Sequence, residues 1–211
     1  MASTAISAQG STLHIGTGSG SAKTISGVAL GNPTILTATG HGFNVGDRVT
    51  IASVGGATTV NGAWSVKFKT ANTFAIELDT TGGSSYTSGG TATPVTWSQV
   101  KNLTTFNGFD GSASEIDRSN MDSVAKEFLL GLVDNGSFTV GIDYDYADAG
   151  QAALLAKQVS GIITDFKLTL PDTRVATFTA YVKKLPIAGG VDQKVRRDGV
   201  ELRISGAVSW A

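Results

Sequence analysis

The sequence predicts a mainly β fold with one flanking α-helix, and three observations lead to that prediction. Glycine is frequent, with 27 residues among 211, and serine and threonine are abundant, which is typical of short strands joined by tight turns. The apolar residues come in short runs bounded by turn residues, and several runs alternate with polar residues at the period of a half-buried strand. One segment, residues 148–161, carries the start and stop signals of a helix.

The first elements divide into an arm, a strand and a small module. Residues 1–12 are small and polar and are expected to form a mobile arm. A strand is predicted at 12–16, followed by a flexible glycine-serine segment at 16–21. Residues 22–94 carry few charges and predict a separate small all-β barrel or sandwich. Its strands are expected at 34–37, 48–51, 63–68 and 73–78, with a hairpin signal at Asn61-Gly62 and a loose loop at 82–90.

Residues 95–211 continue the larger domain. A strand is predicted at 96–100, and a strand followed by a large loop at 104–136. Residues 137–146 alternate regularly, so one strand is expected there. Its apolar face would carry Phe138, Val140, Ile142, Tyr144 and Tyr146.

The helix and the last strands complete the predicted order. Asp148 is the expected N-cap of the helix, and Gly161 is expected to end it. Strands are predicted at 166–170 and 175–183, joined by a turn at 171–173. Alternation from Val200 through Leu202, Ile204, Val208 and Trp210 predicts that the chain ends inside a strand. The predicted organisation is one domain of residues 1–21 and 95–211, with residues 22–94 inserted at an exposed hairpin tip, where insertions are tolerated.

The residue types present give little support to catalysis. The sequence has no cysteine, which excludes disulfides, thiolate metal sites and a cysteine nucleophile. Its two histidines, His14 and His41, fall in different predicted modules and outside any catalytic motif. The net charge of −1 gives no overall attraction for nucleic acid. We therefore expect no enzyme, no cofactor and no metal site.

Two charged runs have residue types that can form sites. Asp143, Asp145 and Asp148 have spacings seen at the start of calcium loops, but the glycine and final glutamate of an EF-hand are missing. We interpret Asp143 and Asp145 as the polar face of a strand and Asp148 as a helix cap. A basic cluster at 194–197 lies next to Asp192 and Asp198, and is interpreted as a solvated loop or as ion pairs across a subunit boundary.

The N-terminus and the hydropathy pattern concern location. Residues 1–10 have neither the basic nor the apolar region of a signal peptide. No stretch approaches the roughly 18 apolar residues of a membrane span. We therefore expect no signal peptide and no membrane span.

Several segments resemble one known family. Residues 106–117 (FNGFDGSASEID) and 120–138 look like the tail tube protein, or major tail protein, of long-tailed, lambda-like phages. Four later segments are similar to the same family in their order along the chain and in their residues: 148–151 at the helix start, 166–172, 184–192 and 202–210. The resemblance covers about residues 1–21 and 95–211, so the 22–94 module departs from the shortest members.

The resemblance implies a tail-tube β-sandwich flanked by one helix, forming hexameric rings that stack into a tube through which DNA passes. It implies a virion tail protein assembled in the cytoplasm of a bacterial host. Its partners would be copies of itself, a tape measure protein inside the tube, initiator or distal and terminator proteins at the ends, and DNA only in transit. The module would lie on the tube exterior.

In this family the N-terminal arm and the long loop, here about 110–135, contact other subunits and rings. The candidate contact residues are therefore Ala5, Ile6, Phe109, Glu115, Asp117, Arg118, Phe128 and Leu130.

Two further expectations concern function. An acidic lumen would repel phosphates and let DNA slide, and Asp143 and Asp145 are the candidates to line it. The alternative class is a particle-borne or secreted glycan-binding adhesin, suggested by Trp64 and Tyr86 in the module. Single aromatic residues are more often part of a core.

Overall fold

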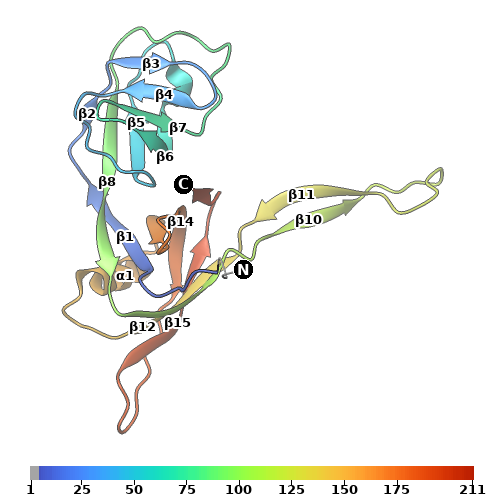
Figure 1. The fold of residues 1–211 in the computed structure, drawn as a ribbon. Coiled ribbons are helices and arrows are strands. Elements are labelled where there is room, and N and C mark those ends of the chain that lie inside the picture. Colours follow the sequence, from blue (N-terminus) through green and yellow to red (C-terminus); the bar gives the residue numbers. More distant parts are fainter. Residues whose placement is uncertain (1–4) are drawn as a thin grey trace.

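The computed structural model describes residues 5–211, which form two stacked lobes and two long projections (Figure 1). The body lobe contains β1, β9, β12 to β16 and α1, the module lobe contains β2 to β7, and β8 runs through both. The strands are β1 (Thr12–Ser19), β2 (Lys23–Thr24), β3 (Gly27–Ala29), β4 (Thr34–Thr37), β5 (Arg48–Ala52), β6 (Gly62–Lys69), β7 (Thr73–Ile76), β8 (Thr91–Val100), β9 (Leu103–Gly108), β10 (Ser112–Asp117), β11 (Phe128–Asp134), β12 (Ser137–Asp143), β13 (Thr164–Thr169), β14 (Val175–Lys184), β15 (Arg196–Ile204) and β16 (Ser209–Trp210). The helix α1 spans Ala149–Ser160, and a 3-10 turn spans Thr58–Val60.

One long antiparallel sheet connects the lobes. Its order is β3-β4-β7-β6-β5-β8-β1-β13-β14-β15-β12-β9, with β16 beside β14 and β2 beside β8. The sheet bends around two separate cores, and β10 and β11 form a small sheet of their own. The predicted class, mainly β with one flanking helix, is confirmed.

The two lobes have separate hydrophobic cores. In the body, Phe138, Phe166 and Phe178 are fully buried, and Leu154 of α1 belongs to the same cluster. In the module, a second cluster forms around Phe74, with the remaining buried members Ile25, Leu36, Ala38, Phe43, Val49, Ile51, Val54, Ala57, Val60, Val66, Ile76 and Ala92. The division at residues 22 and 94 stays a prediction. Strand β8 crosses the second of these limits without a break, since it pairs with β5 up to Pro94 and with β1 from Val95 onward.

The lobes are joined by specific polar contacts as well as by β8. The Lys167 ammonium lies 2.9 Å from the Asp47 carboxylate, with both side chains largely buried, and also sits 4.8 Å from the ring centre of Trp97. The Thr177 hydroxyl donates to the Gly46 carbonyl at 2.9 Å. Gly46 has φ +81°, and a Cβ there would lie 2.5 Å from Val175, so only glycine allows this close approach.

The predicted helix boundaries are confirmed. The Asp148 carboxylate accepts a hydrogen bond from the Gln151 backbone N–H at 2.9 Å, and Gly161 ends the helix in the left-handed region with φ +66°. The predicted strand at 137–146 is too long, because β12 ends at Asp143. The Gln151 side chain bonds the Asp143 carbonyl and the Asp145 N–H, so these backbone groups are withdrawn from the sheet. Tyr144 and Tyr146 are consequently exposed instead of sharing the core face.

Other predicted segments need correction. The large loop expected after the strand within 104–136 is instead the β10–β11 hairpin. The strand expected at 200–210 is broken, because β15 ends at Ile204 and Gly206, with φ +93°, turns the chain into β16. The segment 16–21 is less flexible than predicted, because β1 continues to Ser19 with a register shift after Gly16.

The ends of two predicted module elements also change. Strand β7 ends at Ile76, short of the predicted limit of 78. The 82–90 loop is anchored, because the Tyr86 hydroxyl lies 3.1 Å and 3.0 Å from the carbonyl oxygens of Ile25 and Gly89. Of the predicted N-terminal arm, residues 1–4 lie outside the described residues, and β1 begins at Thr12.

Candidate assembly interface

The β10–β11 hairpin is the most conspicuous exposed element of the molecule. It extends away from both lobes as a two-stranded ribbon (Figure 1), and within residues 5–211 its strands pair only with each other. An isolated hairpin of this kind is at best marginally stable in water. The hairpin therefore needs another surface to hold it, and the described body does not supply one.

The side chains of this hairpin are unusually apolar for an exposed ribbon. Leu130 is 79% exposed and Leu132 is 91% exposed. The other large exposed apolar residues of the hairpin and its tip are Ile116, Met121, Val124, Phe128, Leu129 and Val133. Apolar surface gathered in this way marks an interaction site rather than ordinary surface, because burying it from water is strongly favourable.

The register of the hairpin gives it two different faces. Glu115 lies opposite Leu130, and Asp117 lies opposite Phe128, so carboxylates and apolar side chains share one face. We call this set of four residues the acidic face. Ile116 opposite Leu129 points to the other side of the ribbon. Both faces are thus available for contact: one carries Ile116 and Leu129 next to the Arg118–Glu127 ion pair, and the other carries apolar side chains next to carboxylates.

Hydrogen bonds lower the pKa of two carboxyl groups of the hairpin. The pKa of Asp117 is lowered first by a hydrogen bond from the Ser119 side chain and then by one from the Ser119 N–H, at 2.9 Å. The pKa of Asp134, at the base of the hairpin, is lowered by hydrogen bonds from the Gly136 N–H and from Arg203. The ion pairs Arg118–Glu127 and Lys126–Asp117 are long, at 3.7 Å and 3.6 Å, and exposed, so they contribute little to stability.

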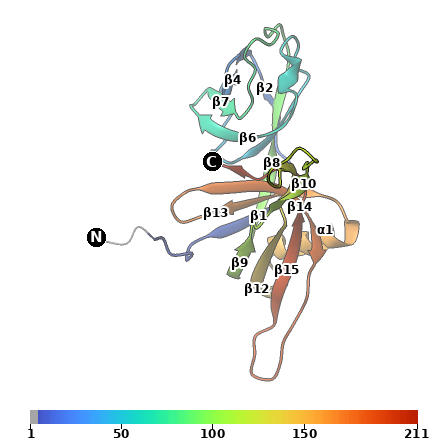
Figure 2. The same ribbon diagram turned by 90° about the vertical axis from the view of Figure 1, so that its right-hand side faces the viewer.

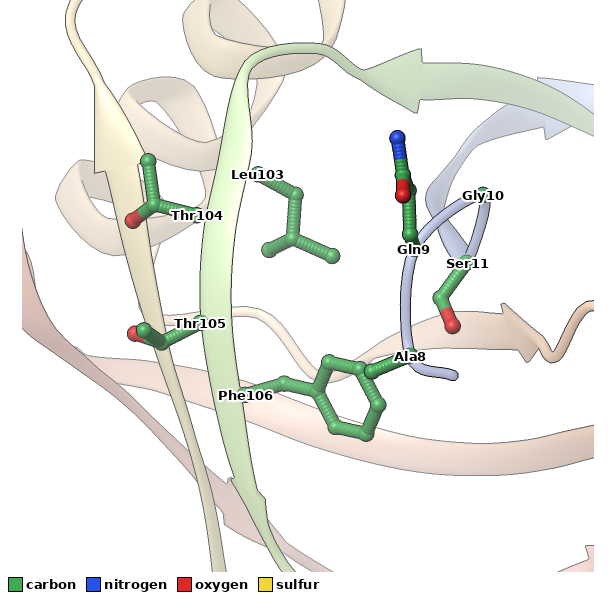
Figure 3. Close-up of a pocket in the computed structure, with 8 residues that line it drawn as sticks. All are labelled: Ala8, Gln9, Gly10, Ser11, Leu103, Thr104, Thr105 and Phe106. Carbon is green, nitrogen blue, oxygen red and sulfur yellow. The ribbon is translucent and has the colours of Figure 1, made fainter. Parts of the chain in front are cut away.

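A cavity lies beside the edge of the body sheet. Strand β9 ends the strand order, so its outer edge has no strand partner among residues 5–211. Between it and the segment Ala8–Ser11 is a cavity of about 650 Å³. Figure 3 shows Leu103 and Phe106 pointing from β9 toward this segment, while Thr104 and Thr105 point away. An unpaired edge next to an open space can accept a strand from another chain.

The predicted contact residues fall into three environments. Glu115, Asp117, Arg118, Phe128 and Leu130 all lie on the projecting hairpin and are exposed. Ala5 and Ile6 lie in the exposed N-terminal segment. Phe109 instead turns inward, with its ring centre 5.0 Å from Phe138 and 5.3 Å from Phe178. Their roles at subunit boundaries stay predictions.

The predicted lumen residues are close together but already have partners. The Asp143 carboxylate lies 2.9 Å from the Lys194 ammonium, and the Asp145 carboxylate accepts from the Ala147 N–H at 2.9 Å. Asp148 is buried as the helix cap. Within the described part of the chain, no three His, Cys, Asp or Glu side chains gather as a metal site.

The histidines have structural surroundings. His41 is buried, and its Nδ1 accepts a hydrogen bond from the Phe43 N–H at 3.0 Å. Its Nε2 therefore carries the proton and donates to the Thr73 carbonyl at 3.1 Å. His14 is half-buried in β1, and burial lowers its pKa, with Lys167 adding to the shift.

The hairpin that joins β14 to β15 forms the second projection (Figure 2). It is closed by the Ala188–Arg196 bridge and exposes Ile187, Val191 and Val195. Of the basic cluster, Lys194 pairs with Asp143, Arg196 pairs with Asp198, and the Arg197 guanidinium lies 4.8 Å from the ring centre of Tyr144. The sequence shows these charges but not that they stand on a projection.

Comparison with known families identifies two segments. Residues 77–168 match the family described as phage tail tube, lambda-like. That segment runs from the end of the module lobe through β8, the β10–β11 hairpin and α1 to β13. The matched segment is less than half of the chain, and it supports a structural tail tube protein located in the virion tail.

Residues 31–101 match the family described as the ubiquitin-activating enzyme E1 FCCH domain. This segment covers most of the module lobe and continues into the body lobe through β8. No curated protein matches the chain. Within residues 5–211, no helix is long and apolar enough to cross a membrane.

Proposed function

We propose that this chain polymerises as stacked rings into the tube of a long phage tail, the conduit for DNA ejection. The observation that carries the proposal is the β10–β11 hairpin, whose apolar side chains stand in water on both faces of an unsupported ribbon. The exposure of these apolar side chains in a single copy is explained if neighbouring subunits bury the ribbon in the assembly. The partial match to lambda-like tail tubes supports the same function.

The edge of β9 gives a second reason for polymerisation. A tube built from sheets needs each exposed edge to be paired or covered, because open edges otherwise aggregate. The β9 edge and the cavity beside Ala8–Ser11 offer a place where a neighbour completes the sheet. Where different surfaces of two successive copies meet, the contact is heterologous and generates rings or filaments.

The finer features of the proposal follow the family. The rings are hexameric, the module lies outside, and a tape measure protein occupies the tube during assembly in the host cytoplasm. Initiator or distal proteins and terminator proteins bind the tube ends, and DNA is present only in transit. Asp143 and Asp145 line the lumen, where Lys194 offsets part of the charge of Asp143.

Replacing both aspartates with lysine should slow DNA ejection, since cationic walls bind phosphates. Unchanged ejection by assembled tails would contradict this lining.

The test is assembly of the purified chain. Negative-stain electron microscopy and sedimentation across rising concentration should show rings or hollow tubes of uniform width. The variant Leu130→Ser with Leu132→Ser should shift assembly to higher concentration, while Val159→Ser on α1, another exposed apolar residue, serves as the matched control. A chain that stays monomeric even at millimolar concentration would contradict the proposal.

A glycan-binding adhesin is the second candidate, favoured by a cleft between the lobes. The cleft has a volume of about 320 Å³ and is lined by Trp64, Arg48 and Glu77 among others. An aromatic ring beside charged groups is a common basis for sugar recognition, although the Trp64 indole N–H already donates to the Val60 carbonyl at 2.8 Å. Binding on a glycan array that is lost in Trp64→Ala, without any assembly, would favour this function.

A further inference from the structure

The two projections of the molecule have opposite charge. Residues 110–134 contain six acidic and two basic side chains, a net charge of −4. Residues 183–197 contain five basic and one acidic side chain, a net charge of +4. Asp198 and Glu201, which pair with Arg196 and Lys183 on the same hairpin, lower this net charge to +2. The whole chain carries only −1, so charge is separated onto the two projecting hairpins.

The 183–197 projection, which we call the basic hairpin, is also an exposed apolar surface. Val191 at its tip is 91% exposed, and Ile187 and Val195 are also exposed. The Lys194 side chain is 80% exposed, and its ion pair with the half-buried Asp143 is open to solvent on the lysine side, so Lys194 can exchange partners. The basic hairpin therefore offers apolar side chains with nearby cations.

The acidic face of β10–β11 offers the complementary set. Glu115 beside Leu130 and Asp117 beside Phe128 place carboxylates next to apolar side chains. Exposed apolar residues also occur on α1 and just after it, at Leu155, Val159 and Ile162, but the cation within that helix is Lys157 alone. Charge thus selects the basic hairpin as the better complement, because opposite potentials fix the partner and the register.

The two hairpins leave the body in different directions, as Figures 1 and 2 show. Contact between them therefore requires a second copy of the chain. We infer that the acidic face of one copy docks against the basic hairpin of the next, with Leu130 near Val191 and Glu115 near Lys194. This inference rests on the proposed function and names the receiving surface, and repeating the contact extends the assembly by one subunit each time.

Charge reversal tests the pairing. Glu115→Lys alone and Lys194→Glu alone should each raise the concentration needed for assembly about three- to tenfold, because a like-charge contact replaces an attractive one. The double variant, with both reversals in one chain, should assemble nearly as well as wild type. Lys69→Glu on the module lobe is the control and should leave assembly unchanged. A double variant no better than the product of the two single effects would overturn the inference.

Disulfide trapping tests whether the same two residues lie close together. Because the chain has no cysteine of its own, the introduced cysteines cannot crosslink to a native one. Leu130→Cys and Val191→Cys proteins, mixed and assembled under mild oxidation, should give a crosslinked dimer of the two variants. Mixing Leu130→Cys with Val159→Cys should not, and preferential crosslinking to position 159 would place the hairpin on α1 instead. Tubes without the 130–191 crosslink would overturn the docking alone, whereas wild-type protein that never assembles would contradict the proposed function.

Discussion

Two hairpins of this protein contain similar residues and have opposite surroundings. In β13–β14, Phe166, Leu168 and Phe178 are fully buried, because β13 also pairs with β1 and β14 also pairs with β15. In β10–β11, side chains such as Leu130 and Leu132 are exposed, because within residues 5–211 the two strands pair only with each other. Apolar content alone does not say whether a hairpin stabilises the fold or an assembly; the neighbouring strands decide.

The largest effect is expected in the buried hairpin. Phe178 contacts the rings of Phe109, Phe138 and Phe166 at centroid distances of 5.3, 5.3 and 5.6 Å. Phe178→Ala should lower the free energy of unfolding by about 3–5 kcal/mol, from lost burial and the cavity left behind. Urea denaturation followed by tryptophan fluorescence measures this change. A loss below about 1 kcal/mol would mean that the body core tolerates the cavity and that the buried β13–β14 hairpin does not stabilise the fold more than the exposed β10–β11 hairpin does.

The next effect concerns the junction between the lobes. Asp47→Asn leaves the largely buried Lys167 ammonium without its carboxylate partner and should lower the free energy of unfolding by about 1–3 kcal/mol. The double variant Asp47→Asn with Lys167→Met removes the unpaired charge and should recover part of that loss. Urea denaturation of wild type, both single variants and the double variant gives the coupling energy, and additive losses would contradict a coupled pair.

A smaller effect depends on pH. Burial and Lys167 lower the pKa of His14 from its ordinary value of 6.5, whereas Asp47 acts in the opposite direction. Below pH 6.5 the His14 side chain therefore binds a proton in the unfolded chain more readily than in the folded chain. The free energy of unfolding falls as the pH falls, until the pH is also below the pKa of His14 in the folded chain. His14→Gln should lose less stability than wild type between pH 7 and 5. Asp165, whose pKa is raised by burial, contributes with the opposite sign, but it is present in both proteins and cancels from the difference. Parallel stability curves for the two proteins would exclude this role for His14.

The smallest effect on stability is expected in the exposed hairpin. Leu130→Ser should change the free energy of unfolding of the monomer by less than about 0.5 kcal/mol, because the side chain contacts mainly solvent. The same variant should impair assembly in sedimentation. A monomer destabilised as strongly as by Phe178→Ala would show that the hairpin packs on its own body, and the distinction between the two hairpins would be lost.

The sequence predicts the regular parts of this fold well. Alternation identifies most strands, and Asp148 and Gly161 define the helix, because these signals are local. The strand through Tyr146 is predicted wrongly, since the Gln151 side chain, which ends it, belongs to a later element. Alternation also fails for Phe128–Asp134, where both faces are apolar and the register shifts, so the sequence pattern predicts a loop there.

The candidate interface is harder to predict than the fold. The resemblance to tail tubes points to the 110–135 segment, but not to its shape or its faces. The inward turn of Phe109 depends on contacts with Phe138, Phe178 and Trp210, which are distant in sequence. The basic hairpin carries visible charges, yet only the pairing of β14 and β15 makes it a projection. Exposure arises from tertiary structure, so composition cannot supply it.

The continuous strand β8 has a mechanical consequence. The chain enters the module lobe from β1 and leaves it through β8, and these two strands pair along residues 13–19 and 95–100 inside the body. A pull on the module lobe is therefore carried by two anchored strands, rather than by one flexible tether. Whatever grips the module lobe from outside would transmit its force directly into the body sheet.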